Sequence, residues 1–324
     1  MAENQLYDLV IVGGGPGGLS AGIYAMRAAL KTILLEKAIP GGQVVMSDEI
    51  ENYPGIEHIS GTELSQKFAS HAQSYGLEIV SQEVVEVVPG LEHHKVKLAN
   101  GDTLKALSVI MATGGSPRKL QIKGEDEYYG KGVSYCGVCD GFFFRNKTVV
   151  VIGGGDTAAE EALYLSKLAN KVYMVHRRNE LRAGMILQER IKSECKIEIV
   201  WNTVCTSING DANGVDSVTL KSTETGEEMN LKADGAFVFI GFIPNNQLVP
   251  RGIKLNAEGY VVTDEKCETN VPGLYVIGDL REKYARQIVV SASDGCIAAL
   301  AAAHYVETRK SGEACELPAE FLNG

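Results

Sequence analysis

The residues that decide the fold are Leu6-Tyr-Asp-Leu-Val-Ile-Val-Gly-Gly-Gly-Pro-Gly-Gly18. Residues 6–12 form a short, mostly apolar and β-branched run, which predicts a buried strand of a parallel sheet. Gly13, Gly15 and Gly18 follow at Gly-x-Gly-x-x-Gly spacing, and residues 19–29 have the pattern of a helix. Glycines at these positions let the backbone turn tightly and approach a pyrophosphate, which then lies at the positive end of the helix. The sequence therefore predicts a Rossmann-type dinucleotide-binding unit.

The next strand, expected over residues 31–35, leads to an acidic residue. Glu36 lies 18 residues after Gly18, close to the offset at which a carboxylate accepts hydrogen bonds from a ribose of the dinucleotide. The alternative is a tight strand-to-helix turn without a ligand, and the position of Glu36 argues against it.

The same order of elements begins again in the middle of the chain. Residues 148–152 predict a strand, Gly153-x-Gly155-x-x-Ala158 a glycine turn, residues 157–168 a helix and residues 171–175 a second strand. This repetition predicts a second nucleotide-binding unit.

The second unit differs from the first at the end of its second strand. His176-Arg177-Arg178 stands there, with Arg182 following, where the first unit has Glu36. Guanidinium groups in place of the carboxylate are typical of a site for a 2′-phosphate, although exposed arginines of a solvated loop give the same pattern. The two units are therefore expected to bind different nucleotides.

Two further strands that end in glycine, residues 109–115 and 237–242, each close one unit and predict internal hinges. Residues 269–279 then predict a turn and a buried strand that delivers Asp279, and residues 287–310 a long helix. We expect an α/β fold in which the second Rossmann-like domain is inserted into the first. The expected domain boundaries are 1–115 for the first part of the outer domain, 116–244 for the inserted domain and 245–324 for the second part.

A pair of cysteines lies between the two glycine turns, in Cys136-Gly137-Val138-Cys139-Asp140. A zinc site would need two more thiolates or imidazoles, and His93-His94 is an adjacent pair without companions, so no metal is expected. A redox-active dithiol fits better, and Asp140 is a candidate proton donor and acceptor or, alternatively, a helix cap. The remaining cysteines have no pairing pattern and are expected to be idle thiols: Cys195, Cys205, Cys267, Cys296 and Cys315.

Charge and composition exclude several classes of function. The net charge of −10 and the absence of a long basic run argue against a nucleic-acid partner. No signal-peptide pattern precedes Arg27, the first basic residue, and the most apolar segment, residues 296–303, is shorter than the roughly 18 residues of a membrane span. We expect a cytoplasmic protein without a membrane partner.

Together these motifs resemble those of the low-molecular-weight thioredoxin reductases, in the same order and over almost the whole chain. The matching segments are Gly41-Gly42-Gln43, Glu51-Asn52-Tyr53-Pro54-Gly55, Ala112 to Arg118, Ser134 to Gly141, His176 to Ala183, Gly278-Asp279 and Arg286-Gln287. The resemblance implies a homodimer that uses NADPH to reduce the disulfide of thioredoxin through FAD and the Cys136–Cys139 disulfide. It also implies that Cys139 faces the flavin, that Cys136 attacks the substrate, and that a domain rotation alternates between the two half-reactions.

The resemblance assigns the outer domain to FAD and the inserted domain to NADPH. The residues implied for FAD are Gly13, Gly15, Gly18, Glu36, Lys37, Gly41, Gly42, Gln43, Asn52, Thr113, Gly114, Gly278, Asp279, Arg286, Gln287 and Ile288. Those implied for NADPH are Gly153, Gly155, Asp156, Thr157, Ala158, His176, Arg177, Arg178 and Arg182.

The sequence departs from the family pattern at two places. Gly137-Val138 stands where the family commonly has Ala-Thr, and residues 281–285 replace an acidic-aromatic segment. Either change can affect which disulfide is accepted. The alternatives are a flavin-dependent disulfide reductase or dithiol oxidase with another partner, and a nonenzymatic nucleotide-binding redox sensor.

Overall fold

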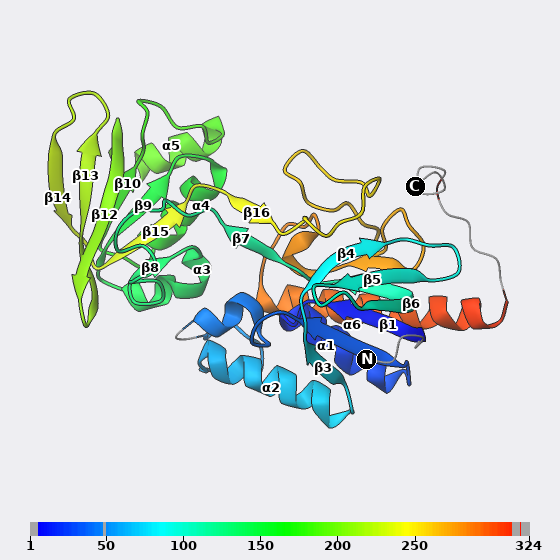
Figure 1. The fold of residues 1–324 in the computed structure, drawn as a ribbon. Helices are drawn as coiled ribbons and strands as arrows, with labels where there is room; N and C mark the ends of the chain where they lie inside the picture. Colours follow the sequence, from blue (N-terminus) through cyan, green and yellow to red (C-terminus); the bar gives the residue numbers. More distant parts are fainter. Residues whose placement is uncertain (1–5, 48–49, 313–317, 319–324) are drawn as a thin grey trace. The chain divides into compact units, whose positions relative to one another are not determined.

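The computed structural model describes residues 6–47, 50–312 and Pro318. The chain divides into two compact units, and the second is inserted into the sequence of the first (Figure 1). Unit 1 comprises Met1–Ser47, Tyr53–Ser116 and Ile243–Gly324, and unit 2 comprises Asp48–Asn52 and Pro117–Phe242. Both contain parallel sheets with helices, so the predicted α/β, Rossmann-type fold class is confirmed. Cys315 lies outside the described residues.

Unit 1 is built on a seven-stranded mixed sheet with the order β3-β2-β1-β6-β5-β4, in which β17 also pairs with β6. The strands are β1 (Leu6–Val12), β2 (Thr32–Glu36), β3 (Glu78–Ser81), β4 (Val84–Val88), β5 (His94–Leu98), β6 (Thr103–Met111) and β17 (Leu274–Val276). Strands β3, β2, β1, β6 and β17 run parallel, whereas β5 is antiparallel to both β6 and β4. The carboxyl ends of the parallel strands therefore lie at one edge, where nucleotides bind in such sheets.

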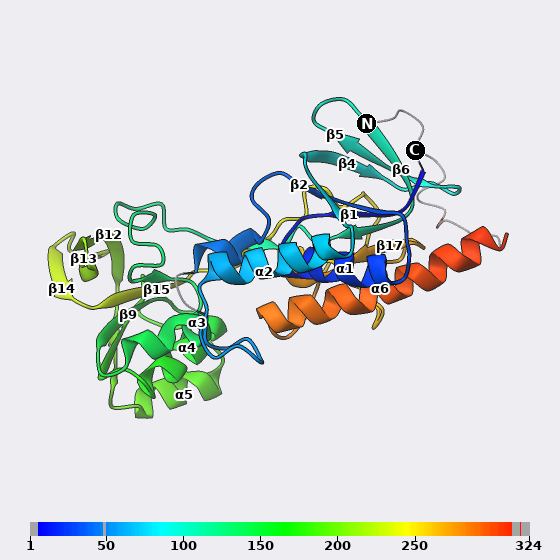
Figure 2. The ribbon, with the colours of Figure 1, turned by 90° about the horizontal axis from the view of Figure 1, so that it is seen from below.

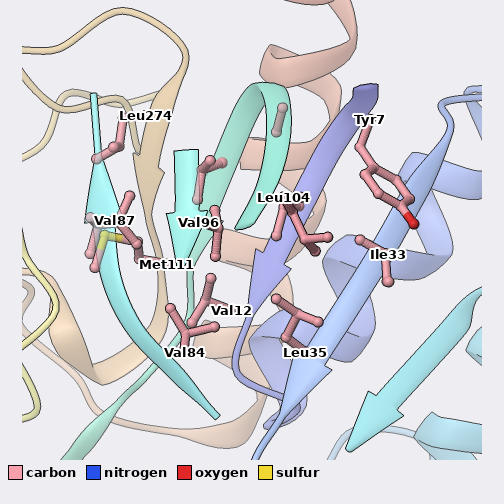
Figure 3. Close-up of a cluster of buried hydrophobic side chains, with 14 of the residues drawn as sticks. Tyr7, Val12, Ile33, Leu35, Val84, Val87, Val96, Leu104, Met111 and Leu274 are labelled. Carbon is pink, nitrogen blue, oxygen red and sulfur yellow. The ribbon is translucent and has the colours of Figure 1, made fainter. Parts of the chain in front are cut away.

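The two faces of this sheet are covered differently. One face carries Tyr7, Val12, Ile33 and Leu35 from the parallel strands, and these pack with side chains of β4, β5 and β6 (Figure 3). The helices α1 (Pro16–Arg27), α2 (Gly61–Ser74) and α6 (Ile288–Lys310) lie side by side on the opposite face (Figure 2). Because both faces are covered, β1 is buried along almost its whole length.

Helices α1 and α6 approach each other closely through small residues. A Cβ on Gly295 would overlap the carbonyl oxygen of Gly17, and the Ser20 hydroxyl donates to the Ala292 carbonyl at 2.7 Å. The first turn of α1 is thereby fixed against α6, although more than 270 residues separate them in the chain.

Unit 2 repeats the same plan. Its parallel sheet has the order β11-β10-β9-β15-β8 and is packed on one face against α4 (Asp156–Ser166) and α5 (Met185–Ser193). The strands are β8 (Val133–Ser134), β9 (Thr148–Gly153), β10 (Lys171–Val175), β11 (Ile197–Val200) and β15 (Gly235–Phe239). An antiparallel sheet covers the other face and consists of β12 (Thr203–Asp211), β13 (Gly214–Ser222) and β14 (Glu228–Lys232).

Two of the passages of the chain between the units lie in β7 (Gly115–Pro117) and β16 (Phe242–Pro244), and these two strands pair with each other. The amide of Arg118 also donates to the Gly241 carbonyl at 2.9 Å. The two crossings are therefore one paired connection rather than two separate linkers.

Most predicted elements lie near their expected bounds, but the strand expected over residues 109–115 is β6, which ends at Met111, and two further expectations differ from the structure. Helix α1 begins at Pro16 rather than residue 19, because proline is favoured in the first turn, where its missing N–H is not needed. Helix α6 is, by length and composition, apolar enough to cross a membrane, so the expectation that no segment has this property was wrong. This helix contributes Ala298, Ala299 and Ala302 to the core of unit 1, a position in which such composition is also common.

Candidate active site

The two cysteines between the glycine turns form a disulfide in unit 2. The sulfur atoms of Cys136 and Cys139 are 2.06 Å apart. Cys136 caps the one-turn helix α3 (Gly137–Asp140), and its sulfur accepts a hydrogen bond from the Cys139 amide at 3.2 Å. Both residues are half-buried, while Val138 between them is exposed. The Cys136 sulfur is therefore fixed by a backbone hydrogen bond, and the turn between the two cysteines is exposed to solvent.

Asp140 is held next to the disulfide by a serine that the sequence analysis did not place in the site. The Ser134 hydroxyl lies 2.5 Å from Asp140 Oδ2 and 3.0 Å from the amide nitrogen of Cys136. Ser134 ends the short strand β8, two residues before Cys136, so a hydroxyl at this spacing was the available signal. The arrangement orients the carboxyl group predicted to handle protons.

A second carboxylate supports the segment before the disulfide. Glu125 is buried and accepts hydrogen bonds from the amides of Leu120 and Gln121 at 2.8 and 2.6 Å. It also accepts from the hydroxyl of Tyr135 at 2.9 Å, and burial is the largest cause that raises the pKa of this tyrosine. Tyr135 is thus anchored as a neutral phenol directly before Cys136.

The first glycine turn has the shape of a pyrophosphate cradle. A Cβ on Gly18 would overlap the Gly13 carbonyl oxygen, and one on Gly13 would overlap that of Ala112, so both glycines are required by close packing. A Cβ on Gly15 would meet nothing within 4 Å. The space in front of Gly15 and the start of α1 is therefore open, as a dinucleotide phosphate requires.

Glu36 lies at the carboxyl end of β2, as predicted, and is tied to the glycine turn. Its Oε2 accepts from the Gly14 amide at 2.6 Å and its Oε1 from the Ala38 amide at 2.9 Å. A carboxylate offers about four acceptor positions, so two remain for ribose hydroxyls. The next residue, Lys37, points to solvent and lies 3.9 Å from Glu83.

The segment after β2 brings three more predicted residues toward the same turn. The Gly41 amide donates to the Gly14 carbonyl at 2.7 Å, and a Cβ on Gly42 would lie 3.3 Å from the Gly15 Cα. Gly42 begins the 3-10 helix η1 (Gly42–Met46), in which the Gln43 amide group donates to the Gly115 carbonyl. Asn52 is exposed and is assigned to unit 2.

The end of β6 is locked by an asparagine that the sequence analysis did not consider. Thr113 and Asn245 exchange two hydrogen bonds, each of 2.8 Å, between side chain and main chain. The backbone N–H of Asn245 also donates to the Gly114 carbonyl at 3.0 Å. Thr113 and Gly114 are thereby fixed where the chain leaves unit 1.

Asp279 lies in the 3-10 helix η3 (Gly278–Leu280), directly after β17, and is held within a buried charged cluster. Lys283 Nζ lies 3.3 Å from Asp279 Oδ1 and 3.4 Å from Asp294 Oδ2, and Asp294 also accepts from the Gly278 amide at 3.0 Å. Arg281 completes the cluster with an ion pair of 2.9 Å to Asp294. Asp279 Oδ1 is buried and ion-paired with Lys283, and a carboxylate oxygen in this position keeps a lone pair for a ligand hydroxyl.

The last predicted residues of unit 1 lie at the start of α6. The Arg286 guanidinium stacks on the Tyr260 ring, 4.3 Å from its centroid. Gln287 is the N-cap of α6 and Ile288 is its first residue. The amide groups of this helix start are therefore available near η3.

The second glycine turn has the same construction as the first. A Cβ on Gly153 would overlap the Phe239 carbonyl oxygen and approach the Ala158 side chain, whereas a Cβ on Gly155 would meet nothing within 4 Å. Asp156 begins α4 and its carboxylate accepts from the Gly184 amide at 2.7 Å, and Thr157 next to it is exposed. The open space again lies at a helix start.

The positive residues after β10 divide into a buried histidine and exposed arginines. His176 is 5% exposed, lies against Gly154 and meets the Trp201 ring edge-on, and burial lowers its pKa. Arg177, Arg178 and Arg182 are exposed, and the Arg182 amide donates to the Gly154 carbonyl at 2.7 Å. Three exposed positive charges thus follow β10, and the last of them is tied to the second glycine turn through its backbone.

Metal binding is not indicated by the geometry. Within the part of the chain that the structure describes, no group of three or more His, Cys, Asp or Glu side chains could hold a metal ion.

Comparison with known sequences places these features in a family. The profile of the pyridine nucleotide-disulphide oxidoreductases matches residues 7–295. The thioredoxin reductase of Bacillus subtilis is 45% identical over 307 residues, which are 95% of this chain and 97% of the relative. The chain belongs to the pyridine nucleotide-disulphide oxidoreductase family.

Solved structures give the same result at a finer level. Thioredoxin reductase from Streptococcus pyogenes has a TM-score of 0.90 and 39% identity, covering 94% of this chain and 99% of that one. Thioredoxin reductase from Giardia duodenalis has a TM-score of 0.89 and 36% identity, covering 94% and 100%. The resemblance to thioredoxin reductases inferred from the motifs is confirmed, and the chain is an oxidoreductase.

Proposed function

We propose that the protein is an NADPH-dependent thioredoxin reductase that carries FAD in unit 1 and binds NADPH in unit 2. The observation that carries the proposal is the Cys136–Cys139 disulfide in an inserted unit, with one open dinucleotide turn in each unit. The names of the relatives support thioredoxin as the substrate.

The residues of unit 1 fit a flavin dinucleotide. Gly13, Gly15 and Gly18 leave room for the pyrophosphate at the start of α1, and Glu36 has acceptor positions left for the adenosine ribose. The Asp279 carboxylate, held by Lys283, would accept a hydrogen bond from a hydroxyl of the flavin side chain. When bound, FAD supplies the means to pass the reducing equivalents of NADPH to a disulfide.

The residues of unit 2 fit NADPH in preference to NADH. Gly155 leaves the pyrophosphate position open at the start of α4. Arg177, Arg178 and Arg182 are exposed beside this turn and can each donate charged hydrogen bonds to a 2′-phosphate. His176 stands where unit 1 has the Glu36 carboxylate, so no negative charge opposes the phosphate there, and burial lowers the pKa of His176 and favours its neutral form.

The dithiol formed by reduction of Cys136 and Cys139 would then reduce the partner by exchange. The Cys136 thiolate attacks one sulfur of the thioredoxin disulfide and releases the other as a thiolate, forming a mixed disulfide. The Cys139 thiolate next attacks the Cys136 sulfur, which restores the enzyme disulfide and releases reduced thioredoxin. Asp140, oriented by the Ser134 hydroxyl, holds or returns the proton exchanged with these thiols.

We also propose that the protein is a soluble, cytoplasmic homodimer without a membrane or nucleic-acid partner. Helices α1 and α6 expose apolar side chains, among them Tyr24, Val289, Ile297 and Leu300. A second copy of the chain would cover them. Light scattering after size-exclusion chromatography tests this point, and a Leu300→Glu variant should shift the protein toward the monomer.

One assay tests the reaction. The purified, FAD-loaded protein is mixed with NADPH or NADH, and with thioredoxin, a small aromatic disulfide or oxygen alone. Fast oxidation of NADPH only with thioredoxin supports the proposal. Oxygen consumption without NADPH would instead indicate a dithiol oxidase, and nucleotide binding without turnover would identify a redox sensor.

A further inference from the structure

A third carboxyl group, Glu161, approaches the Cys136–Cys139 turn from helix α4. It lies two turns into the helix, where α4 packs against α3. A Cβ on Gly137 would overlap Glu161 Oε2, so the glycine inside the Cys-x-x-Cys motif makes room for this carboxyl group. Gly137 stands where the family commonly has alanine, which gives this departure a structural consequence.

The surroundings of Glu161 oppose its ionisation. Burial raises the pKa of Glu161 to about 7, and the charge of Glu160 adds to the rise, while the amides of Gly137 and Val138 act in the opposite direction. Glu161 Oε2 is buried and, among the described residues, has no hydrogen-bond partner.

Other charged groups near α4 are otherwise engaged or point away. On α3, Asp140 is hydrogen-bonded to Ser134. On α5, which packs against the same helix, Glu189, Arg190 and Lys192 are exposed and are not among the groups that move the Glu161 pKa. Glu161 is therefore a carboxyl group that changes its charge near neutral pH directly behind the dithiol turn.

We propose that Glu161 is a positioning residue of the dithiol site, whose carboxyl group supports the Gly137–Val138 backbone and whose negative charge opposes formation of the Cys136 thiolate. The effect of Glu161 on turnover rests on the proposed function. Its effect on the acidity of the Cys136 thiol does not, because that acidity can be measured without NADPH or thioredoxin.

Glu161 and the Cys136 sulfur contact the backbone of the same turn. The Cys136 sulfur is held by the Cys139 amide, and the two intervening residues are those that contact Glu161. A nearby like charge raises the pKa of a thiol, and the effect is strong where solvent is partly excluded. Protonation of Glu161 below neutral pH therefore favours the thiolate, and its ionisation above neutral pH disfavours it.

The test measures the acidity of Cys136 in a Cys139→Ser background after reduction with dithiothreitol. The protein is pulsed with iodoacetamide between pH 5 and pH 10, and modification of Cys136 is quantified by mass spectrometry. Replacement of Glu161 by Gln keeps the shape but removes the charge. It should lower the apparent pKa of the Cys136 thiol by roughly one unit and abolish an inflection near pH 7.

Two controls decide the outcome. Glu160→Gln removes the same charge from the neighbouring, exposed position and should shift the Cys136 profile much less, and the exposed Cys195 in the same samples should not shift at all. Gly137→Ala displaces the carboxyl group without touching it chemically and should shift the profile in the same direction as Glu161→Gln. An unchanged Cys136 profile in Glu161→Gln, or an equal shift in Glu160→Gln, would overturn the proposal.

Discussion

The two units carry the same glycine turn but close it with different side chains. In unit 1 the middle glycine, Gly14, lies against Glu36, whose carboxylate accepts the Gly14 amide hydrogen. In unit 2 the equivalent Gly154 lies against the ring of His176. Each side chain follows directly from the second strand of its sheet, so the repeat places a carboxylate in one unit where the other has a buried, neutral imidazole.

This difference shows that the equivalent of Glu36 is His176, and that the arginines are additions after it. From the sequence alone, the arginines were expected to replace the carboxylate. In the structure, the histidine fills the space next to the turn and leaves Arg177 and Arg178 exposed beyond it. Preference for NADPH over NADH is therefore expected to have two causes. His176 removes the negative charge that a carboxylate would carry, and Arg177 and Arg178 add positive charges.

The sharpest distinction between the units is that only unit 2 carries the predicted redox centre. Replacement of either Cys136 or Cys139 by Ser should lower thioredoxin turnover by on the order of 10³-fold or more, because exchange needs one thiol to attack and one to resolve. FAD content and NADPH affinity should not change. A thioredoxin without its own resolving cysteine should be trapped on Cys136, as mass spectrometry can determine. Capture on Cys139 would reverse the assigned roles, and full turnover by either variant would remove the pair from the mechanism.

The shared part of the repeat can be tested by the same change in both units. Gly15 and Gly155 have φ angles of −71° and −93° and open space around a Cβ, so the folded chain can accept valine at either position. Gly15→Val should weaken FAD binding on the order of 10²-fold by filling the pyrophosphate position, while NADPH binding persists. Gly155→Val should do the reverse.

FAD absorbance and the emission of Trp201, the single tryptophan, provide the two readouts for this pair. Trp201 lies in unit 2 with its ring centroid 6.4 Å from that of His176, so it is well placed to report NADPH binding. A fully loaded, yellow Gly15→Val protein would contradict the assignment of FAD to unit 1.

The different part of the repeat can be tested by removing the arginines. Each charged hydrogen bond to a 2′-phosphate contributes about 1.5 to 3 kcal/mol, so Arg177→Ala with Arg178→Ala should raise KM for NADPH by on the order of 10²-fold. KM for NADH and kcat should change far less, because the contacts are remote from the reacting atoms. Arg190→Ala, the same change at an exposed arginine of α5, is the matched control and should leave both KM values unchanged. Equal losses with NADPH and NADH would refute the assignment.

The units are also expected to differ in their sensitivity to acid. His94 in β5 of unit 1 is 1% exposed, and burial lowers its pKa to about 4. The unfolded chain, with an ordinary histidine pKa near 6.5, binds the proton more tightly, so stability is lost as pH falls below that value. The loss should reach about 2 kcal/mol at pH 5.

Hydrogen exchange followed by mass spectrometry can test this difference. Amides of β4, β5 and β6 should lose protection between pH 7 and pH 5, after correction for the intrinsic pH dependence of exchange, and a His94→Gln variant should lack this change. A loss of protection in β4, β5 and β6 that persists in the His94→Gln variant would show that His94 is not the cause.

Local sequence predicted those features that depend on neighbouring residues. The strand, glycine turn and helix of each unit, and the pairing of Cys136 with Cys139, follow from short-range spacing and were found as expected. Glu161 and Asp294 were missed, because each reaches its turn from a helix more than ten residues away. A carboxylate in a helix has many roles, and only the packing of that helix identifies one of them.

Strand pairing shows the same limit. The start of β6 pairs with β5 and its end with β17, and the apolar pattern of β6 does not indicate that two different strands share one edge. The expectation that no segment is apolar enough to span a membrane was wrong for a different reason, because it considered residues 296–303 and not the whole length of α6. Its apolar segment is interrupted by few charges, and one of them, Asp294, is buried in ion pairs that only the tertiary structure provides.

The insertion of unit 2 has a consequence for the order in which the molecule is assembled. During synthesis, residues 117–242 leave the ribosome as one continuous segment whose main contacts are internal, so this unit can fold as soon as it is made. Unit 1 cannot, because β6 lacks β17 and α1 lacks α6 until the last part of the chain appears. For that period an open strand edge and an apolar helix face of the first unit stay uncovered, a state prone to aggregation. The nascent chain therefore depends on its final helix to close the domain that was begun first.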